Sequence, residues 1–281
     1  MKKKLIYILG SQRSGTTALE YILSTNPNLF ALGEVRLLDD FIANIPKLKV
    51  SLGRCTCGIS LNECTFWSKI LNRVSVDFGF SGGDLLTNVP FVEDKVSCKK
   101  HLHALFETLS DETNQVLVDS SKNLDYLDFL IGTLPDWEIS VIYVTREPLE
   151  VALSVQKWHK HFDFKKQSIY EIMSKWAYAN WKMVRWLRRH SNITQFELRY
   201  ESFVTDPDAS LLGLSNALGL SNQFQRSLNL RELHTVSGTP SRFNSDEFRL
   251  SPVPMKNQIK GNFLLRFLSW AIRRLCHKYS M

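Results

Sequence analysis

The sequence predicts an α/β fold in which a central parallel sheet is flanked by helices, giving three layers. The first observation is a short apolar run at 5–9 that leads through a glycine-bounded loop into a helical pattern. The second is a set of later apolar runs with strand character, separated by helical segments, at 115–119, 139–144 and 194–199. Strands that alternate with helices form βαβ units, which place the strands parallel in one sheet.

Composition and charge suit a globular protein that meets anions. The 281 residues, 44% of them hydrophobic, can form one large core. We expect one domain, 1–281, with a cysteine-containing insertion at about 47–90 and a basic C-terminal helix at about 263–279. The net charge of +7 favours an anionic ligand or surface. The run at 5–9 is too short for a signal peptide, and no run reaches the roughly 18 apolar residues of a membrane span, so we expect a cytoplasmic protein.

The loop GSQRSGTT has the strand–loop–helix setting of a phosphate-binding loop. Gly10, Gly15 and Thr17 match the Walker A spacing, but Thr16 stands where that motif has its lysine. Arg13 supplies a cation earlier in the loop. Backbone N–H groups at the start of a helix bind anions. The loop therefore predicts a P-loop-like fold and an anion other than a metal-bound nucleoside triphosphate.

A single carboxylate also follows the first predicted helix. Glu34 comes directly after Gly33, where a helical stretch at 35–45 begins. A carboxylate close to a phosphate loop can act as a general base. A lone glutamate is otherwise solvated surface, and the residues alone leave both interpretations open.

Cysteines gather in the insertion, at Cys55, Cys57 and Cys64. Three thiols would bind zinc if Cys98 or a histidine supplied a fourth ligand. The usual four-ligand spacing is missing, so a stabilising loop or a disulfide is favoured, and no metal site is predicted. The odd total of five cysteines does not indicate a full disulfide framework.

Polar and cationic side chains follow the second and third predicted strands. Lys122 comes after the strand at 115–119, and Arg146 comes after the strand at 139–144. Ligands of open α/β sheets bind at the carboxyl ends of the strands. We therefore expect Arg146, with Ser154 on the following helix, to hold a second phosphate, since a guanidinium forks onto phosphate oxygens. A structural salt bridge is the alternative for Arg146.

Aromatic and basic side chains gather in the second half of the chain. Trp158, His159 and His161 lie outside the apolar stripe of the helix at 169–190, and they either line an acceptor cleft or pack internally. Regular structure fades beyond residue 220. The amphipathic, basic helix at 263–279 either caps the fold or makes peripheral contact with an anionic membrane.

Together, these motifs resemble the sulfotransferases that use 3′-phosphoadenosine 5′-phosphosulfate (PAPS), from Leu5 to about Gly261. GSQRSGTT is similar to their 5′-phosphosulfate loop, VIYVTREPLEVALS to their 3′-phosphate segment, and LRYESFVTDP to the segment after their fourth strand. The cysteine loop, DSSK and SGTPSRF resemble a bacterial branch similar to carbohydrate and tyrosylprotein sulfotransferases. The donor-binding residues that the resemblance implies are Ser11, Gln12, Arg13, Ser14, Gly15, Thr16, Thr17, Arg146, Ser154, Tyr200, Arg242 and Lys260.

The same resemblance implies three catalytic residues, Glu34, Arg13 and Lys122. Tyrosylprotein sulfotransferases share Arg-Ser-Gly-Thr-Thr and take their base from a Gly-Glu pair, which the pair ending at Glu34 matches. Lys122 matches their lysine after the second strand. The catalytic histidine of cytosolic sulfotransferases has no counterpart at 119–122, and the family's C-terminal K-G-x-x-G-D-W-K signature begins at Lys260 but does not continue.

The resemblance implies sulfuryl transfer from PAPS to a hydroxyl on a carbohydrate or glycolipid, with a phenol as a further acceptor class. Glu34 would remove the acceptor proton, and Arg13 and Lys122 would stabilise the leaving charge. No metal is expected, and no nucleic acid partner. One alternative is a P-loop-type kinase using ATP, whose lysine is missing here. The other is a non-enzymatic module that binds polyanions, which does not explain the ordered motifs at the strand ends.

Overall fold

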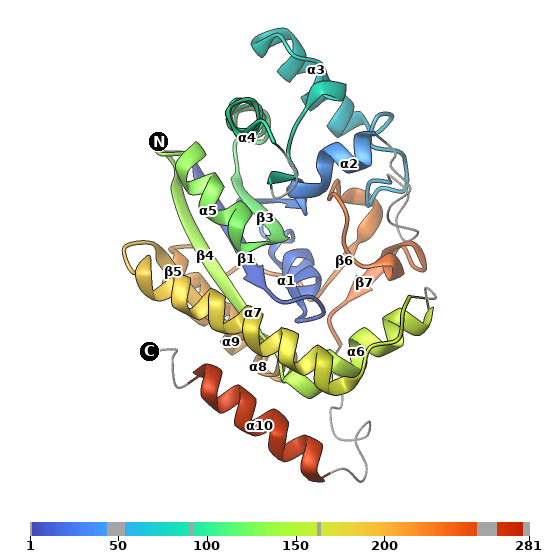
Figure 1. Ribbon diagram of the computed structural model, residues 1–281. Coiled ribbons are helices and arrows are strands. Elements are labelled where there is room, and N and C mark those ends of the chain that lie inside the picture. The colour runs from blue at the N-terminus through green and yellow to red at the C-terminus, as the bar shows by residue number, and fades with distance from the viewer. Residues whose placement is uncertain (1, 44–53, 90–92, 162–163, 252–262, 278–281) are drawn as a thin grey trace. The chain divides into compact units, whose positions relative to one another are not determined.

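The computed structural model describes residues 2–43, 54–89, 93–161, 164–251 and 263–277, and it contains a five-stranded sheet (Figure 1). The strands follow one another across the sheet in the order β2-β3-β1-β4-β5. Their bounds are β1 (Lys4–Gly10), β2 (Leu29–Gly33), β3 (Val116–Lys122), β4 (Glu138–Thr145) and β5 (Thr194–Arg199). The sheet is mostly parallel and flanked by helices, which confirms the predicted fold class.

The strands β1 and β4 are mostly apolar and buried, as expected for strands that helices cover on both faces of the sheet. Every residue of β1 after Lys4 is buried. Parallel strands buried on both faces have continuous apolar runs instead of alternation. The sequence predicts four strands, and the structure adds β2, which pairs in parallel with β3, with Leu29 opposite Val116. A five-residue run beside a turn has too little pattern to be recognised as a strand on its own.

The helices begin at recognisable signals. Their bounds are α1 (Thr16–Leu23), α2 (Leu38–Ile42), α3 (Thr65–Phe78), α4 (Lys95–Thr113), α5 (Leu124–Thr133), α6 (Pro148–His161), α7 (Ile169–Arg189), α8 (Tyr200–Thr205), α9 (Pro207–Leu218) and α10 (Phe263–His277). Asp94, Ser168 and Asp206 cap α4, α7 and α9 by accepting first-turn N–H groups. Each such cap stabilises the fold by about 1 kcal/mol. Within the described ranges, every helix is too short or too polar to cross a bilayer.

Two regions hold more regular structure than the sequence predicts. The insertion contains α3 and a 3-10 helix at Gly82–Asp84, while its residues 47–53 and 90 lie outside the described ranges. Beyond residue 220, β6 (Ser227–Asn229) pairs antiparallel with β7 (Glu247–Arg249). Strands of three residues are too short to show periodicity in a sequence.

The chain forms two compact units. The first unit comprises Met1–Ile8, Thr17–Ser140 and Ser221–Arg249, and the second comprises Leu9–Thr16, Val141–Leu220 and Leu250–Met281. The phosphate-loop candidate therefore belongs mainly to the second unit, and Glu34 and Lys122 belong to the first. The single domain 1–281 stays a prediction.

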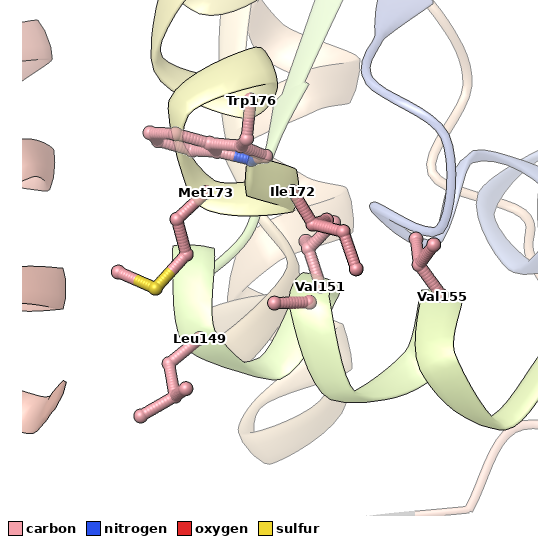
Figure 2. Close-up of a cluster of buried hydrophobic side chains, with 7 residues drawn as sticks. Leu149, Val151, Val155, Ile172, Met173 and Trp176 are labelled. Carbon is pink, nitrogen blue, oxygen red and sulfur yellow. The ribbon is translucent and has the colours of Figure 1, made fainter. Parts of the chain in front are cut away.

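In the second unit, a buried apolar cluster joins α6 to α7 (Figure 2). Its members are Leu149, Val151, Ala152, Val155, Ile172, Met173 and Trp176. Leu268 and Ile272 of α10 pack against the cluster, so one face of α10 caps this core. Burial of each large apolar side chain contributes about 1.5–3 kcal/mol. The cluster thereby holds α6, which carries Ser154, in a defined position.

Candidate active site

The glycine-bounded loop joins β1 to α1 through a tight turn. The hydroxyls of Ser11 and Ser14 lie 2.5 Å apart, and the Ser14 N–H donates to the Ser11 carbonyl at 3.3 Å. Arg13 and Gly15 have φ of +65° and +94°. The turn makes Thr16 the first residue of α1, where backbone N–H groups lack helical partners and attract anions.

Gly15 has no room for a side chain. A Cβ at this position would lie 2.0 Å from the ring of Tyr200, and its positive φ also favours glycine. Tyr200, the first residue of α8, therefore packs directly on the loop. Its ring also lies 4.6 Å from the guanidinium carbon of Arg146, a cation–π contact. Tyr200 thus positions both the loop and Arg146.

Arg13 connects the loop to α6. Its Nε donates to Ser154 Oγ at 3.0 Å. In turn, Nη1 of Arg146 donates to the backbone carbonyl of Arg13 at 3.0 Å. We name Arg13, Arg146 and Ser154 the cation group. The structure thus brings together, in the second unit, three residues that the sequence predicts to bind the donor.

The cation group has more positive than negative charge. Burial and the nearby Arg146 lower the pKa of Arg13. Among the described residues, Arg146 makes one ion pair, a long one of 3.8 Å with Glu150, and its Nε is buried without a hydrogen-bond partner. Burial also raises the pKa of Glu150, which favours the neutral form of that carboxyl. A ligand with several anionic oxygens would relieve the repulsion and accept the remaining N–H bonds.

In the first unit, Glu34 follows β2 and pairs with Lys122 at the end of β3. Oε1 of Glu34 accepts from Lys122 Nζ at 2.9 Å and from Ser237 Oγ at 3.2 Å. The Glu34 and Lys122 side chains are only 15% and 17% exposed. Oε2 of Glu34 has no hydrogen-bond partner within the part of the chain that the structure describes. We name Glu34, Lys122 and Ser237 the acid–base group, because one carboxylate oxygen remains available to accept a proton.

A loop from far along the chain holds the backbone of Glu34. The Glu34 N–H donates to the Val236 carbonyl at 2.8 Å, and the Val236 N–H donates to the Leu32 carbonyl at 2.8 Å. A Cβ on Gly33 would lie 2.1 Å from the Val236 oxygen, and Gly33 has a φ of +83°. Only glycine lets the two segments approach so closely. The loop around Val236 therefore fixes the direction of the Glu34 side chain.

Two buried carboxyl groups in the first unit were not evident from the sequence. Glu20 of α1 accepts from the Gly33 N–H at 2.7 Å and from Ser120 Oγ at 2.9 Å. Asp119 of β3 accepts from the Ser121 N–H at 2.7 Å. Burial raises the pKa of Glu20 to about 8 and that of Asp119 to about 7. Glu20 supports the turn before Glu34 by accepting from the Gly33 N–H. In the sequence, its position beside the apolar stripe of α1 was the signal that could have indicated burial.

The other residues predicted to bind the donor differ in how buried they are. Arg242 is 1% exposed, and its terminal nitrogens donate to the carbonyls of Ser237 and Arg54, so it braces the loop beside Glu34. Gln12 is exposed in the phosphate loop, and Thr17 lies in the first turn of α1. Lys260 lies outside the described residues. The donor contacts of all four stay predictions.

The aromatic residues predicted to line an acceptor cleft pack locally. Trp158 stacks on Phe164 with ring centroids 4.8 Å apart. Nδ1 of His159 lies 3.0 Å from the Lys165 carbonyl oxygen. The side chain of His161 lies outside the described residues. The packing interpretation therefore has direct contacts, and the acceptor cleft stays a prediction.

The cysteines of the insertion meet a histidine that their spacing did not indicate. Cys55, Cys57, Cys64 and His234 place their potential ligand atoms within 4.8 Å of one another. Cys55, Cys57, Cys64 and Cys98 are free thiols, so the disulfide alternative is not formed among these four. Cys98 lies apart from this group, in α4, where its Sγ donates to the Leu86 carbonyl at 3.3 Å.

Comparison with known proteins shows the family of the chain and solved structures with a similar fold. The model of the family described as "Sulfotransferase family" matches residues 6–225. The sulfotransferase domain from the curacin biosynthetic pathway is 18% identical, with a TM-score of 0.61 over 98% of each chain. The sulfotransferase domain from the Synechococcus PCC 7002 olefin synthase is 17% identical, with a TM-score of 0.58 over 100% of this chain and 96% of that one. At these identities the likeness concerns the fold. No curated protein sequence matches the chain.

Proposed function

Because the chain belongs to the sulfotransferase family, we propose that it transfers the sulfuryl group of PAPS to an acceptor hydroxyl. The choice of donor rests on the cation group. In this group two guanidiniums and a hydroxyl from separate segments lie together, and Arg146 has only a long ion pair, with Glu150, among the described residues. PAPS has two anionic ends, the 5′-phosphosulfate and the 3′-phosphate. A site with two cations and a row of helix N-terminal amides has the chemistry to bind both.

The two ends of the donor are assigned to different residues. The N–H groups of the loop from Ser14 to Thr17, with Arg13, bind the 5′-phosphosulfate. Arg146 and Ser154 bind the 3′-phosphate, which distinguishes PAPS from ATP. Tyr200 supports this assignment because it packs on both Gly15 and Arg146, so it couples the two ends of the site.

Glu34 is proposed as the general base that takes the proton of the acceptor hydroxyl. Its carboxylate is shielded, is held by Lys122 and Ser237 through Oε1, and keeps Oε2 for the incoming proton. The acceptor oxygen forms a bond to sulfur while the bond from sulfur to the bridging oxygen of the donor breaks. A general base typically contributes about 10²–10⁴-fold to such a step.

Positive charge is proposed to stabilise the leaving group. Negative charge grows on the bridging oxygen as 3′,5′-ADP departs, in an in-line displacement related in its electrostatics to phosphoryl transfer. Arg13, Lys122 and the loop amides are the groups assigned to neutralise it. Lys122 comes to this role already desolvated in its pair with Glu34, so little reorganisation is required of it.

The acceptor is proposed to be a hydroxyl of a carbohydrate or glycolipid, with a phenol as the other class. Trp158 and His159 of α6 are the side chains assigned to contact it, because aromatic faces stack on sugars and aromatic rings. The two related structures come from a biosynthetic pathway and an olefin synthase, so a natural-product hydroxyl belongs among the acceptors to be tested.

The chain is expected to be cytoplasmic. We propose that the outer face of α10 makes a peripheral contact with an anionic membrane. Phe267 and Trp270 are 56% and 51% exposed on this helix. The guanidinium carbon of Arg274 lies 5.1 Å from the centroid of the Trp270 ring. Exposed aromatic rings together with basic groups suit the bilayer interface.

Thermal unfolding with different ligands tests the donor assignment. We expect 3′,5′-ADP to stabilise the protein, by about 2.7 kcal/mol at one hundred times its Kd. At equal concentration, 5′-AMP should give a clearly smaller shift because it lacks the 3′-phosphate. A larger shift with ATP–Mg²⁺ would support the kinase alternative, and equal shifts with polyphosphate and 3′,5′-ADP would support a general polyanion-binding module.

A further inference from the structure

Three thiols and an imidazole converge in the first unit, and none of these four side chains is assigned a part in sulfuryl transfer. Cys57 Sγ lies 3.7 Å from Cys64 Sγ, and Cys64 Sγ lies 3.2 Å from Nδ1 of His234. Cys55 Sγ lies 3.9 Å from the same Nδ1. The four ligand atoms all lie within 4.8 Å of one another. Each residue thus offers one soft or borderline donor atom toward a common centre.

These separations agree with one tetrahedral ion. Zinc bound at about 2.3 Å by sulfur and about 2.0–2.1 Å by nitrogen places two sulfurs about 3.8 Å apart and a sulfur and a nitrogen about 3.5 Å apart. The observed sulfur–sulfur distance of 3.7 Å is close to the first value, and the sulfur–nitrogen distances of 3.2 and 3.9 Å lie on either side of the second. No large movement of the ligands is needed to enclose an ion.

The surroundings of the cluster orient its ligands. Cys55 and Cys64 are fully buried, and Cys57 and His234 are half-buried. Trp67 Nε1 donates to the His234 carbonyl at 2.7 Å, and Phe66 stacks on the His234 ring with centroids 5.4 Å apart. Residues that fix the orientation of a ligand in this way are a regular part of metal sites.

A short turn directs the cysteines toward the same point. The Cys55 N–H donates to the Ile59 carbonyl at 2.8 Å, and the Gly58 N–H donates to the Cys55 carbonyl at 2.9 Å. Gly58 has a φ of +95°, which suits glycine and tightens the turn. The Cys64 N–H donates to the Ser60 carbonyl at 2.8 Å, just before α3 begins. The backbone itself therefore places the three sulfurs together.

We propose that Cys55, Cys57, Cys64 and His234 bind one zinc ion in a closed structural site. Three thiolates with one imidazole form a donor set typical of structural zinc. Four protein ligands fill a tetrahedral shell and leave no position for substrate, so this ion has no part in sulfuryl transfer. The inference does not depend on which donor or acceptor the enzyme uses.

The position of the site indicates what the ion stabilises. His234 begins the loop whose Val236 and Ser237 hydrogen-bond to the backbone and side chain of Glu34. Beside the cluster, the hydroxyls of Thr56 and Thr235 lie 2.5 Å apart and tie the cysteine turn to the same loop. The zinc ion therefore clamps the loop that holds the proposed base, and its binding free energy contributes to folding of this part of the unit.

Metal analysis of the full-length protein, purified without added chelator, tests the proposal. We expect one zinc per chain by elemental mass spectrometry. The variants Cys64→Ser and His234→Ala should lose the metal to background. The matched control is Cys98→Ser, which alters a buried thiol outside the cluster and should keep one zinc per chain.

A second measurement uses the unaltered chain, so that it does not depend on the folding of variants. Growth with cobalt in place of zinc should give thiolate-to-cobalt charge-transfer bands and the intense visible bands of tetrahedral Co²⁺. The proposal is overturned if neither zinc nor cobalt is bound stoichiometrically, if peptide mapping without reductant finds a disulfide among Cys55, Cys57 and Cys64, or if Cys98→Ser loses as much metal as Cys64→Ser.

Discussion

The two groups differ in how closely their charges are paired. In the cation group, Arg146 Nη2 lies 3.8 Å from Oε2 of Glu150, its one carboxylate partner among the described residues. In the acid–base group, Lys122 Nζ lies 2.9 Å from Oε1 of Glu34. The charges of the acid–base group are balanced without a ligand, because the Glu34 carboxylate meets the Lys122 ammonium and the Ser237 hydroxyl through Oε1. In the cation group, by contrast, Arg13 and Arg146 repel each other, and the buried Arg146 Nε finds no hydrogen-bond partner in the described part of the chain.

The difference suits the two proposed roles, in which the cation group binds the donor and the acid–base group takes part in the chemical step. An anion relieves the repulsion in the cation group, so part of its binding free energy comes from the unfavourable state of the unliganded protein. The acid–base group gains little from an anion, and the role proposed for it is to hold one carboxylate ready for a proton. Mutations in the two groups should therefore have different signatures, in affinity for the first and in turnover for the second.

The largest effect should come from Glu34→Gln, which would separate turnover from binding most clearly. Gln retains an oxygen that accepts from Lys122 and Ser237 but cannot take the acceptor proton. We expect kcat to fall by roughly 10²–10⁴-fold, with the Kd for 3′,5′-ADP little changed. Steady-state sulfuryl transfer and titration calorimetry measure the two quantities. Turnover close to that of the unaltered enzyme would remove Glu34 as the base.

A smaller effect, on affinity, should come from Arg146→Ala. Hydrogen bonds to charged groups contribute about 1.5–3 kcal/mol, so the Kd for 3′,5′-ADP should rise by about 10- to 150-fold. The Kd for 5′-AMP should change much less, because that ligand has no 3′-phosphate. Arg185→Ala is the matched control, since it removes one exposed arginine that stacks on Trp181 in the same unit. Equal losses for both nucleotides would contradict the assignment of Arg146.

The smallest effect should come from Glu20→Gln, which tests whether the Glu20 carboxyl, beside the acid–base group, is protonated in the folded protein. Burial raises the pKa of Glu20 from 4.5 to about 8 in the folded protein. Between these values the folded state holds a proton that the unfolded state has released, so this group's contribution to stability falls as the pH rises. The amide cannot ionise and can still accept from the Gly33 N–H, so the variant should lose this pH dependence.

Denaturant unfolding at several pH values measures that difference. We expect the stability of Glu20→Gln relative to the unaltered chain to rise by about 1–2 kcal/mol between pH 6 and pH 8. Glu232→Gln, which changes an exposed carboxylate of the same unit, should show no such trend. A parallel pH dependence in Glu20→Gln and the unaltered chain would mean that Glu20 is ionised in the folded state.

The cation group illustrates what short motifs predict well. The loop spacing, Arg146 and Ser154 can be identified from the sequence because each belongs to a strand–loop–helix segment of fixed geometry. The order of the strands in the sheet was not predicted, because β2 was not recognised as a strand. Glu34 and Lys122 were each implied by the resemblance without a predicted contact, and the structure brings them together through the pairing of β2 with β3.

Other features depend on contacts between distant parts of the chain. His234 joins cysteines about 170 positions earlier, so no local spacing could reveal the fourth ligand. In the sequence, Glu20 looks like an ordinary acidic residue of a helix. In the structure it is buried against Gly33 and Ser120, and this burial raises its pKa. Arg242, expected to bind the donor, is instead enclosed by backbone carbonyls in the structure, and its donor role stays a prediction.

The sequence by itself determined the fold class, the glycine-bounded loop before the first helix and the cationic residues at the strand ends. These features follow from steric limits and hydrogen bonds among near neighbours in the chain. Only the tertiary structure decided which buried groups share a desolvated site and which ligands meet around one point. Desolvation and metal coordination depend on distances between atoms, and for Glu20 and His234 those distances arise only when remote segments pack together.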